Sequence, residues 1–68
     1  MNLYDYTEPE LDVFRKKCNF VGFEREVFEY RSKAIPLEEI AEKINMSVDG
    51  TKRISRKVNS KVDRIAHL

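Results

Sequence analysis

Residues 37–58 constrain the fold most strongly, because two apolar stripes with helical spacing stand there on either side of a short break. In the first stripe, Ile40 and Ile44 are four positions apart. The second stripe starts at Thr51 and continues to Val58 at spacings of three and four. Such spacing places apolar side chains on one face of an α-helix. The segment is therefore predicted to form two helices joined by a tight turn.

The break itself has the residues of a helix end followed by those of a helix start. Asn45 tolerates the left-handed backbone that ends many helices, and Ser47 is a favoured N-cap for the next helix. Opposite the second apolar stripe lie Asp49, Lys52, Arg53, Arg56 and Ser60. A basic face near the N-terminus of a half-buried helix is typical of a helix that enters the DNA major groove. We interpret residues 37–58 as the core of a helix-turn-helix.

Four positions match that unit: Ala41 is the small residue of its first helix, Asn45 the turn residue, and Thr51 and Ile54 the apolar residues that follow. The longer stretch FEREVFEYRSKAIPLEEIAEKINMSVDGTKRISRKV resembles the pattern LTxREREVLxLxxxGxSxxEIAxxLxxSxxTVKxxxxxI. LuxR-type DNA-binding domains and region 4 of sigma-70-type factors share this pattern. The resemblance covers roughly residues 20–62. It implies a DNA-binding domain built from helices.

The sequence also departs from that pattern. Gly50 replaces a residue that favours helix, which costs about 0.5–1 kcal/mol relative to Ala. Pro36 stands where the family has a capping Ser or Thr, and Ala34 replaces the usual Gly between helices. The Gly that ends the recognition helix of LuxR-type domains is absent from residues 61–64. This last departure favours the sigma-like variant, in which the basic helix continues.

Two further helices are predicted before this unit. Thr7 is the expected N-cap of the first, with Glu10 closing a capping box and Pro9 in the first turn. The expected inward-facing residues are Leu11, Phe14, Cys18 and Val13 in the first helix, Phe20 and Val21 in the connection, and Phe23, Val27 and Tyr30, with Phe28 at the edge, in the second. Glu24, Arg25, Glu26 and Glu29 are expected in solvent. Residues 1–6 form either a frayed arm or an extended segment on the core.

We therefore expect one all-α domain over residues 1–68, a small four-helix bundle with helices at about 8–18, 22–32, 36–45 and 48–65. The stripe of the last helix continues to Leu68. It either packs on the first helix or forms a homodimer through Val58, Val62 and Ile65. LuxR-type domains dimerise through a C-terminal helix, whereas sigma-like modules act as monomers, so the resemblance allows both.

Composition argues against several classes of function. The lone Cys18 cannot form an intramolecular disulfide, and the single histidine, His67, lies far from it in the sequence, so no metal site is expected. Carboxylates such as Glu39 have a base four positions away, here Lys43, so they are explained as solvated ion pairs on helix faces and not as catalytic groups. No Gly-rich phosphate loop is present. Neither an enzyme, nor a cofactor, nor a small-molecule ligand is expected. Without a membrane-length apolar run or a signal-peptide pattern, the expected location is the cytoplasm.

Charge is unevenly distributed along the chain. The formal net charge is only +1, but residues 1–30 carry seven acids and four bases, and residues 31–68 carry nine bases and five acids. Six of those bases lie within residues 51–64, against the single acid Asp63. Because the local field acts on a phosphate backbone, this asymmetry favours a nucleic-acid partner.

The expected base contacts are Val48, Asp49, Lys52, Arg53 and Arg56. Lys and Arg pair with guanine, an acid accepts from cytosine N4, and an apolar side chain contacts the thymine methyl group. Asp49 either contacts a base or only complements the helix dipole. The expected phosphate contacts are Ser47, Lys57, Lys61, Arg31 and Lys33.

The resulting hypothesis is a small transcriptional regulator of bacterial or phage type that binds double-stranded DNA. Its sigma-like version would also contact RNA polymerase through the first two helices. The alternative is a protein-interaction module on the same scaffold, which the near-neutral total charge and Gly50 would fit.

Overall fold

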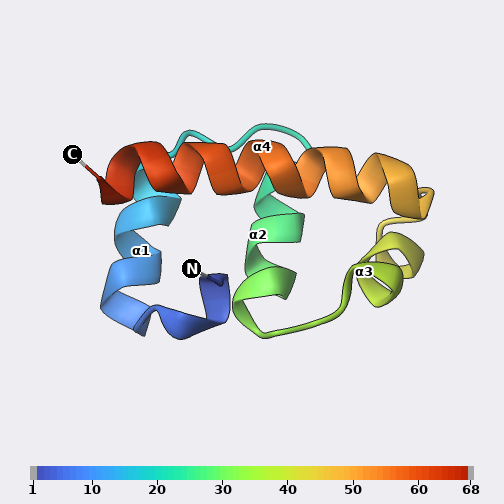
Figure 1. Ribbon diagram of the computed structural model, residues 1–68, viewed down its shortest axis with the longest axis horizontal. Coiled ribbons are helices and arrows are strands. Elements are labelled where there is room, and N and C mark those ends of the chain that lie inside the picture. The colour runs from blue at the N-terminus through green and yellow to red at the C-terminus, as the bar shows by residue number, and fades with distance from the viewer. Residues whose placement is uncertain (1, 68) are drawn as a thin grey trace.

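The computed structural model describes residues 2–67, and within them all regular structure is helical. A short 3-10 helix, η1 (Leu3–Asp5), precedes four α-helices: α1 (Glu8–Lys17), α2 (Glu24–Ser32), α3 (Leu37–Lys43) and α4 (Val48–Ala66). Figure 1 shows α1 and α2 standing beside each other, each meeting α4 at one end, while α4 runs across them. Since α4 contacts all three other α-helices, it organises the bundle. The predicted all-α, four-helix fold is confirmed.

Local capping signals explain where the helices begin. The Thr7 hydroxyl accepts from the Glu10 backbone N–H, and the Glu10 carboxylate accepts from the Thr7 N–H at 2.8 Å, so the predicted capping box is present. Ser47 Oγ accepts from the Gly50 N–H at 3.0 Å and caps α4, as predicted. Each cap satisfies donors that the first helical turn leaves unpaired.

Left-handed residues explain where the predicted bounds differ from the observed ones by one or two positions. Gly22, with φ of 56°, keeps residues 22 and 23 out of α2, which begins at Glu24. Asn45, with φ of 57°, ends the turn after α3, so that helix stops at Lys43 instead of 45. Ala34 also has a positive φ, 62°, at the position where the family pattern has Gly. A residue with a Cβ is strained in this conformation.

The core lies where α2 and α3 meet α4. Its largest fully buried side chains are Phe28, Ile40, Val27, Val58, Val62 and Thr51. Phe28, predicted at the edge of the core, is completely buried and packs against Phe20 with ring centroids 4.8 Å apart. Burial of a phenylalanine side chain contributes about 1.5–3 kcal/mol, so this pair is a major contributor to stability.

The apolar stripe at the C-terminal end of α4 packs inside the chain. Val58 and Val62 are fully buried, and Ile65 is half-buried against the core. Leu68, the end of the predicted stripe, lies outside the described residues. In this arrangement only Ile65 of the three proposed dimer contacts retains accessible surface.

Three residues predicted to face inward are exposed instead. Val13 is 44% exposed because α1 packs through the narrower stripe of Leu11, Phe14 and Cys18. Val21 and Phe23 are 59% and 44% exposed, on either side of the left-handed Gly22. Because α2 begins at Glu24, its inward face starts there and continues through Val27 and Phe28. The predictions for Val13, Val21 and Phe23 were wrong.

Two glutamates expected in solvent are partly or wholly buried. Glu24 is 8% exposed and pairs with Lys61 of α4. Glu29 of α2 accepts two hydrogen bonds from Arg15 of α1, at 2.6 and 3.0 Å. The Arg15 guanidinium also lies 5.8 Å from the centroid of the Phe28 ring. This bidentate pair joins α1 to α2, and it raises the pKa of Arg15 above its ordinary value through the Glu29 hydrogen bonds.

The N-terminal segment lies on the bundle. Leu3 of η1 is 4% exposed and η1 contacts α2, while the ring of Tyr6 meets that of Phe14 edge-on at 4.8 Å. Of the two predicted alternatives, packing on the core holds for residues 2–6, although as a 3-10 turn and not as an extended strand. Residue 1 lies outside the described range.

Candidate nucleic-acid interface

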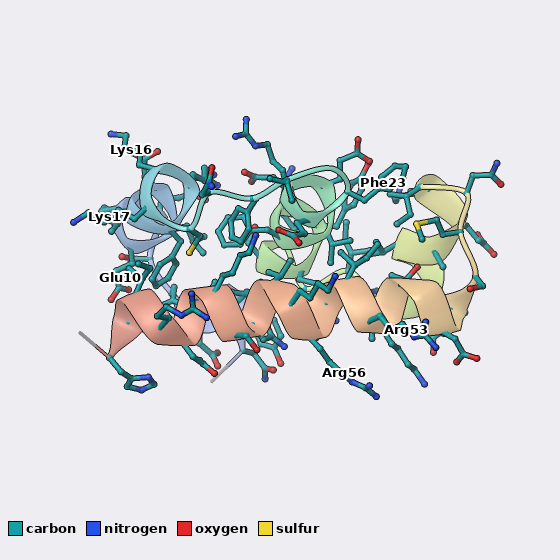
Figure 2. The ribbon with its side chains drawn as sticks, turned by 90° about the horizontal axis from the view of Figure 1, so that it is seen from above. Glu10, Lys16, Lys17, Phe23, Arg53 and Arg56 are labelled. Carbon is teal, nitrogen blue, oxygen red and sulfur yellow. The ribbon has the colours of Figure 1, made fainter. Side chains whose placement is uncertain are left out.

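The exposed face of α4 carries the predicted base-contact residues. Asp49, Lys52, Arg53 and Arg56 are exposed, and Val48 is half-buried at the first position of the helix. Figure 2 shows Arg53 and Arg56 on the side of α4 that faces away from α1 and α2. The opposite side of the same helix is fixed in the core by its buried residues: Thr51, Ser55, Val58 and Val62. One helix thus presents a charged face on a rigid backbone.

The bases on this face carry uncompensated charge. Within residues 2–67 the ion pairs involve only Arg15, Lys16 and Lys61 among the basic residues. Lys52, Arg53, Arg56, Lys57 and Arg64 therefore have no carboxylate within salt-bridge distance in the described part of the chain. Their positive charges are available to a polyanion.

The α3–α4 turn holds α4 in place. Met46 N–H donates to Ala41 O at 2.9 Å, which closes the C-terminal turn of α3 just before the Ser47 cap. Thr51 is fully buried, and its hydroxyl donates to Ser47 O at 2.9 Å. Ala41, 3% exposed, provides the small side chain that lets the two helices approach. The predicted turn residues therefore have the local roles expected of them.

The predicted phosphate-contact residues have different environments. Lys57 and Lys33 are exposed and unpaired among the described residues, and Ser47 Oγ is occupied as a cap acceptor. Arg31 is half-buried, and its Nη1 donates to Ile35 O at 3.2 Å, across the link between α2 and α3. Arg31 thus stabilises the link between α2 and α3.

Lys61 already has an intramolecular partner. Its ammonium forms an ion pair with the Glu24 carboxylate and donates to Asn19 O at 3.3 Å. Glu24 also accepts from the Val21 N–H at 3.2 Å. The hydrogen bond from Lys61 lowers the pKa of Glu24, with help from Val21, although burial acts in the opposite direction. The pair attaches the segment between α1 and α2 to α4, and no local spacing in the sequence could have indicated it.

Cys18 is buried, as predicted, and burial raises the pKa of its thiol while the nearby Lys61 charge partly opposes that rise.

No group of three His, Cys, Asp or Glu side chains in residues 2–67 is arranged to hold a metal ion. Over the same range, no helix combines the length and the apolar character needed to cross a membrane.

Two positions next to the predicted site were not singled out from the sequence. Arg64 is exposed near the C-terminal end of α4, and Lys17 is exposed at the end of α1. Both line an open pocket between these helices. Arg64 was visible only as one of six bases in residues 51–64, and the proximity of Lys17 depends on how α1 meets α4.

Comparisons with known proteins give no relative for this chain. No family model matches it, no curated protein matches it, and no solved structure matches it. The resemblance to LuxR-type domains and sigma region 4 therefore stays an expectation based on the residues quoted above.

Proposed function

We propose that this protein binds double-stranded DNA in a sequence-specific manner and places the N-terminal half of α4 in the major groove. The observation that carries this proposal is the cluster of exposed, unpaired bases Lys52, Arg53 and Arg56 near the capped start of α4. The opposite face of α4 is buried, so these side chains stand on a fixed backbone. Such fixed placement is what base recognition needs, because each contact depends on geometry as well as charge.

The dimensions of α4 suit this role. A helix with its side chains is about 10–12 Å wide, close to the roughly 12 Å width of the major groove of B-DNA. The bundle lies behind α4, and Arg53 and Arg56 face away from it, so α1 and α2 would not obstruct an approaching duplex (Figure 2). α3 packs against the first turns of α4 and would remain beside the groove.

Each exposed residue of the first turns has a base-edge partner that suits its chemistry. Arg53 and Arg56 can donate two hydrogen bonds to guanine O6 and N7, and Lys52 can donate to the same atoms. Asp49 accepts from cytosine N4 or, as the alternative, stabilises the positive end of the helix dipole. Val48, half-buried, offers an apolar surface to a thymine methyl group. Lys57 and Lys33 supply contacts to phosphates, which set orientation and not sequence.

The test is fluorescence anisotropy of a labelled mixed-sequence duplex across a salt series, followed by site selection. Wild type is compared with Arg53→Ala/Arg56→Ala and with the control Lys16→Ala/Arg25→Ala, which also loses two positive charges. Lys16 and Arg25 are exposed on α1 and α2. Because each good base contact contributes about 1–3 kcal/mol of discrimination, the α4 variant should lose at least tenfold in affinity and relax its site preference. The control should keep both.

Folded wild-type protein that fails to bind any duplex at low salt would contradict the proposal. Equal losses in the two variants would contradict it too, because they would show that only total charge matters. Circular dichroism confirms folding in each case.

A second candidate function, protein interaction, is favoured by one observation. Val21 and Phe23 are exposed on the segment between α1 and α2, and Phe23 lies on the opposite side of the bundle from Arg53 and Arg56 (Figure 2). A sigma-like factor could contact RNA polymerase there while α4 occupies DNA. Val21→Ser/Phe23→Ser should leave duplex affinity unchanged but weaken binding to purified RNA polymerase. Unchanged polymerase binding would exclude this surface.

A further inference from the structure

An open pocket lies between the C-terminal end of α1 and the last turns of α4. Its volume is about 280 Å³. The residues that line it, named here the α1–α4 pocket, are Lys17, Cys18, Asn19, Lys61, Arg64 and Ile65. Three of the six are bases, from two helices that are distant in sequence, and none of the six is an acid. This composition suits an anion.

The charge balance of the pocket remains positive after its internal contacts are counted. Lys61 is compensated by Glu24, and its ammonium also covers Asn19 O, which lies beside the negative end of the α1 dipole. Lys17 and Arg64 have no ion pair within residues 2–67. Two bases without an ion pair among the described residues therefore line the opening, and no acid among its lining residues neutralises them.

The two free bases can adjust to a ligand. Lys17 and Arg64 are exposed, and Lys17 points outward from the end of α1 (Figure 2). A lysine ammonium on its flexible stem can turn toward an anion, whereas the planar guanidinium of arginine can donate two parallel hydrogen bonds to phosphate oxygens. Arg64 would thus provide the orientation and Lys17 an additional charge.

The pocket is continuous with the proposed DNA-binding face. Arg53, Lys57, Lys61 and Arg64 follow one another at spacings of four, four and three, so they share one side of α4. Arg64 follows Arg53 by eleven positions, which corresponds to about 16 Å along a helix. This exceeds the roughly 12 Å width of the major groove. If α4 crosses the groove with Arg53 at the bases, its last turns reach the strand that borders the groove.

We infer that the α1–α4 pocket binds a phosphate group of the DNA backbone at the edge of the groove that α4 occupies. This inference rests on the proposed function and adds a contact from α1, outside the helix-turn-helix unit. The pocket fixes how far α4 enters the groove, because it anchors the end of the helix opposite the base-contacting turns. The contact is independent of sequence, since every nucleotide carries the same phosphate.

The experiment compares duplex binding of Lys17→Gln/Arg64→Gln with that of Lys16→Gln/Arg25→Gln over a salt series. Both variants lose one Lys and one Arg from exposed positions, and only the first changes the pocket. The slope of log K against log salt is negative, and loss of one phosphate contact lowers its magnitude by about 0.9. The pocket variant should show that decrease and bind all sequences more weakly by the same factor, with an unchanged selected site. The control should keep the wild-type slope.

An unchanged slope in the pocket variant, with wild-type DNA binding intact, would overturn this inference and leave the proposed function standing. An equal decrease in the control would also overturn it. Absence of duplex binding by wild type would overturn both proposals. A final arm titrates inorganic phosphate without DNA and follows the backbone amides of Cys18 and Asn19 by NMR. Saturable shifts there, combined with an unchanged DNA slope, would assign the pocket to free phosphate and overturn the backbone contact.

Discussion

Replacing Lys61 with Met is expected to destabilise the fold more than replacing Glu24 with Gln, although both substitutions break the same ion pair. The reason is the unequal burial of the two side chains. That of Glu24 is 10% exposed and that of Lys61 is 28% exposed. Without its partner, the ammonium can turn its flexible stem toward water, whereas the carboxylate stays buried with only the Val21 N–H. An uncompensated buried charge is the costly case.

The magnitudes follow from this difference. Breaking a fully buried pair costs about 3–5 kcal/mol and an exposed pair about 0–1 kcal/mol. Lys61→Met leaves the buried carboxylate without its partner and should lower the free energy of unfolding by about 2–3 kcal/mol. Glu24→Gln leaves only the more exposed ammonium and should lower it by about 1 kcal/mol. For a domain of this size, each kcal/mol lowers Tm by about 4–8 °C. The expected decreases are therefore about 8–24 °C and 4–8 °C.

The assay is thermal and urea unfolding followed by circular dichroism, with Lys57→Met as the matched control. Lys57 is exposed one turn before Lys61, so its loss removes the same charge from the same helix without breaking the pair, and its effect on the pKa of Glu24 is the smallest of those that act there. That control should change stability by no more than about 0.5 kcal/mol. If Lys61→Met costs no more than Glu24→Gln, or no more than the control, the pair is solvated and the reasoning fails.

The same pair gives a pH dependence with a definite sign. The pKa of Glu24 is lowered in the fold from its ordinary value of 4.5, so the folded state binds its proton less readily than the unfolded chain. The pair therefore contributes its stability fully above that ordinary value, and loses it as the pH falls through the lower folded value. In Lys61→Met, burial favours the neutral form of Glu24, and only the Val21 N–H and the charge of Lys57 still oppose it. The stability gap between wild type and Lys61→Met should accordingly narrow as the pH falls below about 4.5, the ordinary pKa, toward the lower folded value.

Two further outcomes are expected. Ala34→Gly should raise the free energy of unfolding by up to about 1 kcal/mol, because it removes the strain of a left-handed residue with a Cβ. The control Ala41→Gly, in the interior of α3, should instead lower it by about 1 kcal/mol, and a loss at both positions would show that Ala34 is unstrained. Alkylation of Cys18 by iodoacetamide at pH 8 should be slower in the folded protein than in urea, because burial raises the pKa of the thiol and limits access. Equal rates would mean that α1 separates readily from α4.

The elements that the sequence predicted well depend on local chemistry. Thr7 and Ser47 cap helices whatever the rest of the chain does, and Asn45 ends a helix by its own backbone preference. The burial of Val58 and Val62 follows from the periodicity of α4. These signals operate within four or five residues, so one sequence is enough to reveal them.

The features that escaped prediction depend on distant contacts or on the phase of a helix. Glu24 and Lys61 are 37 positions apart, and nothing near Glu24 indicates that it turns inward. Gly22 is left-handed just before α2, Phe23 beside it is exposed, and Phe28 is fully buried through contacts with residues distant in sequence. The exposed bases of α4 were predicted as a face, but the pocket beside Arg64 requires the position of α1.

The two faces of α4 have a consequence for how such a chain can diversify. Its inner positions, from Thr51 to Val62, determine whether the bundle forms at all, because they meet all three other α-helices. Its outer positions are exposed, and substitutions at exposed sites usually change stability by no more than about 0.5 kcal/mol. Descendants of this sequence could exchange Lys52, Arg53 and Arg56 for new side chains while inheriting an intact scaffold. A library randomised at these three positions should consist largely of folded proteins, each with its own preferred ligand.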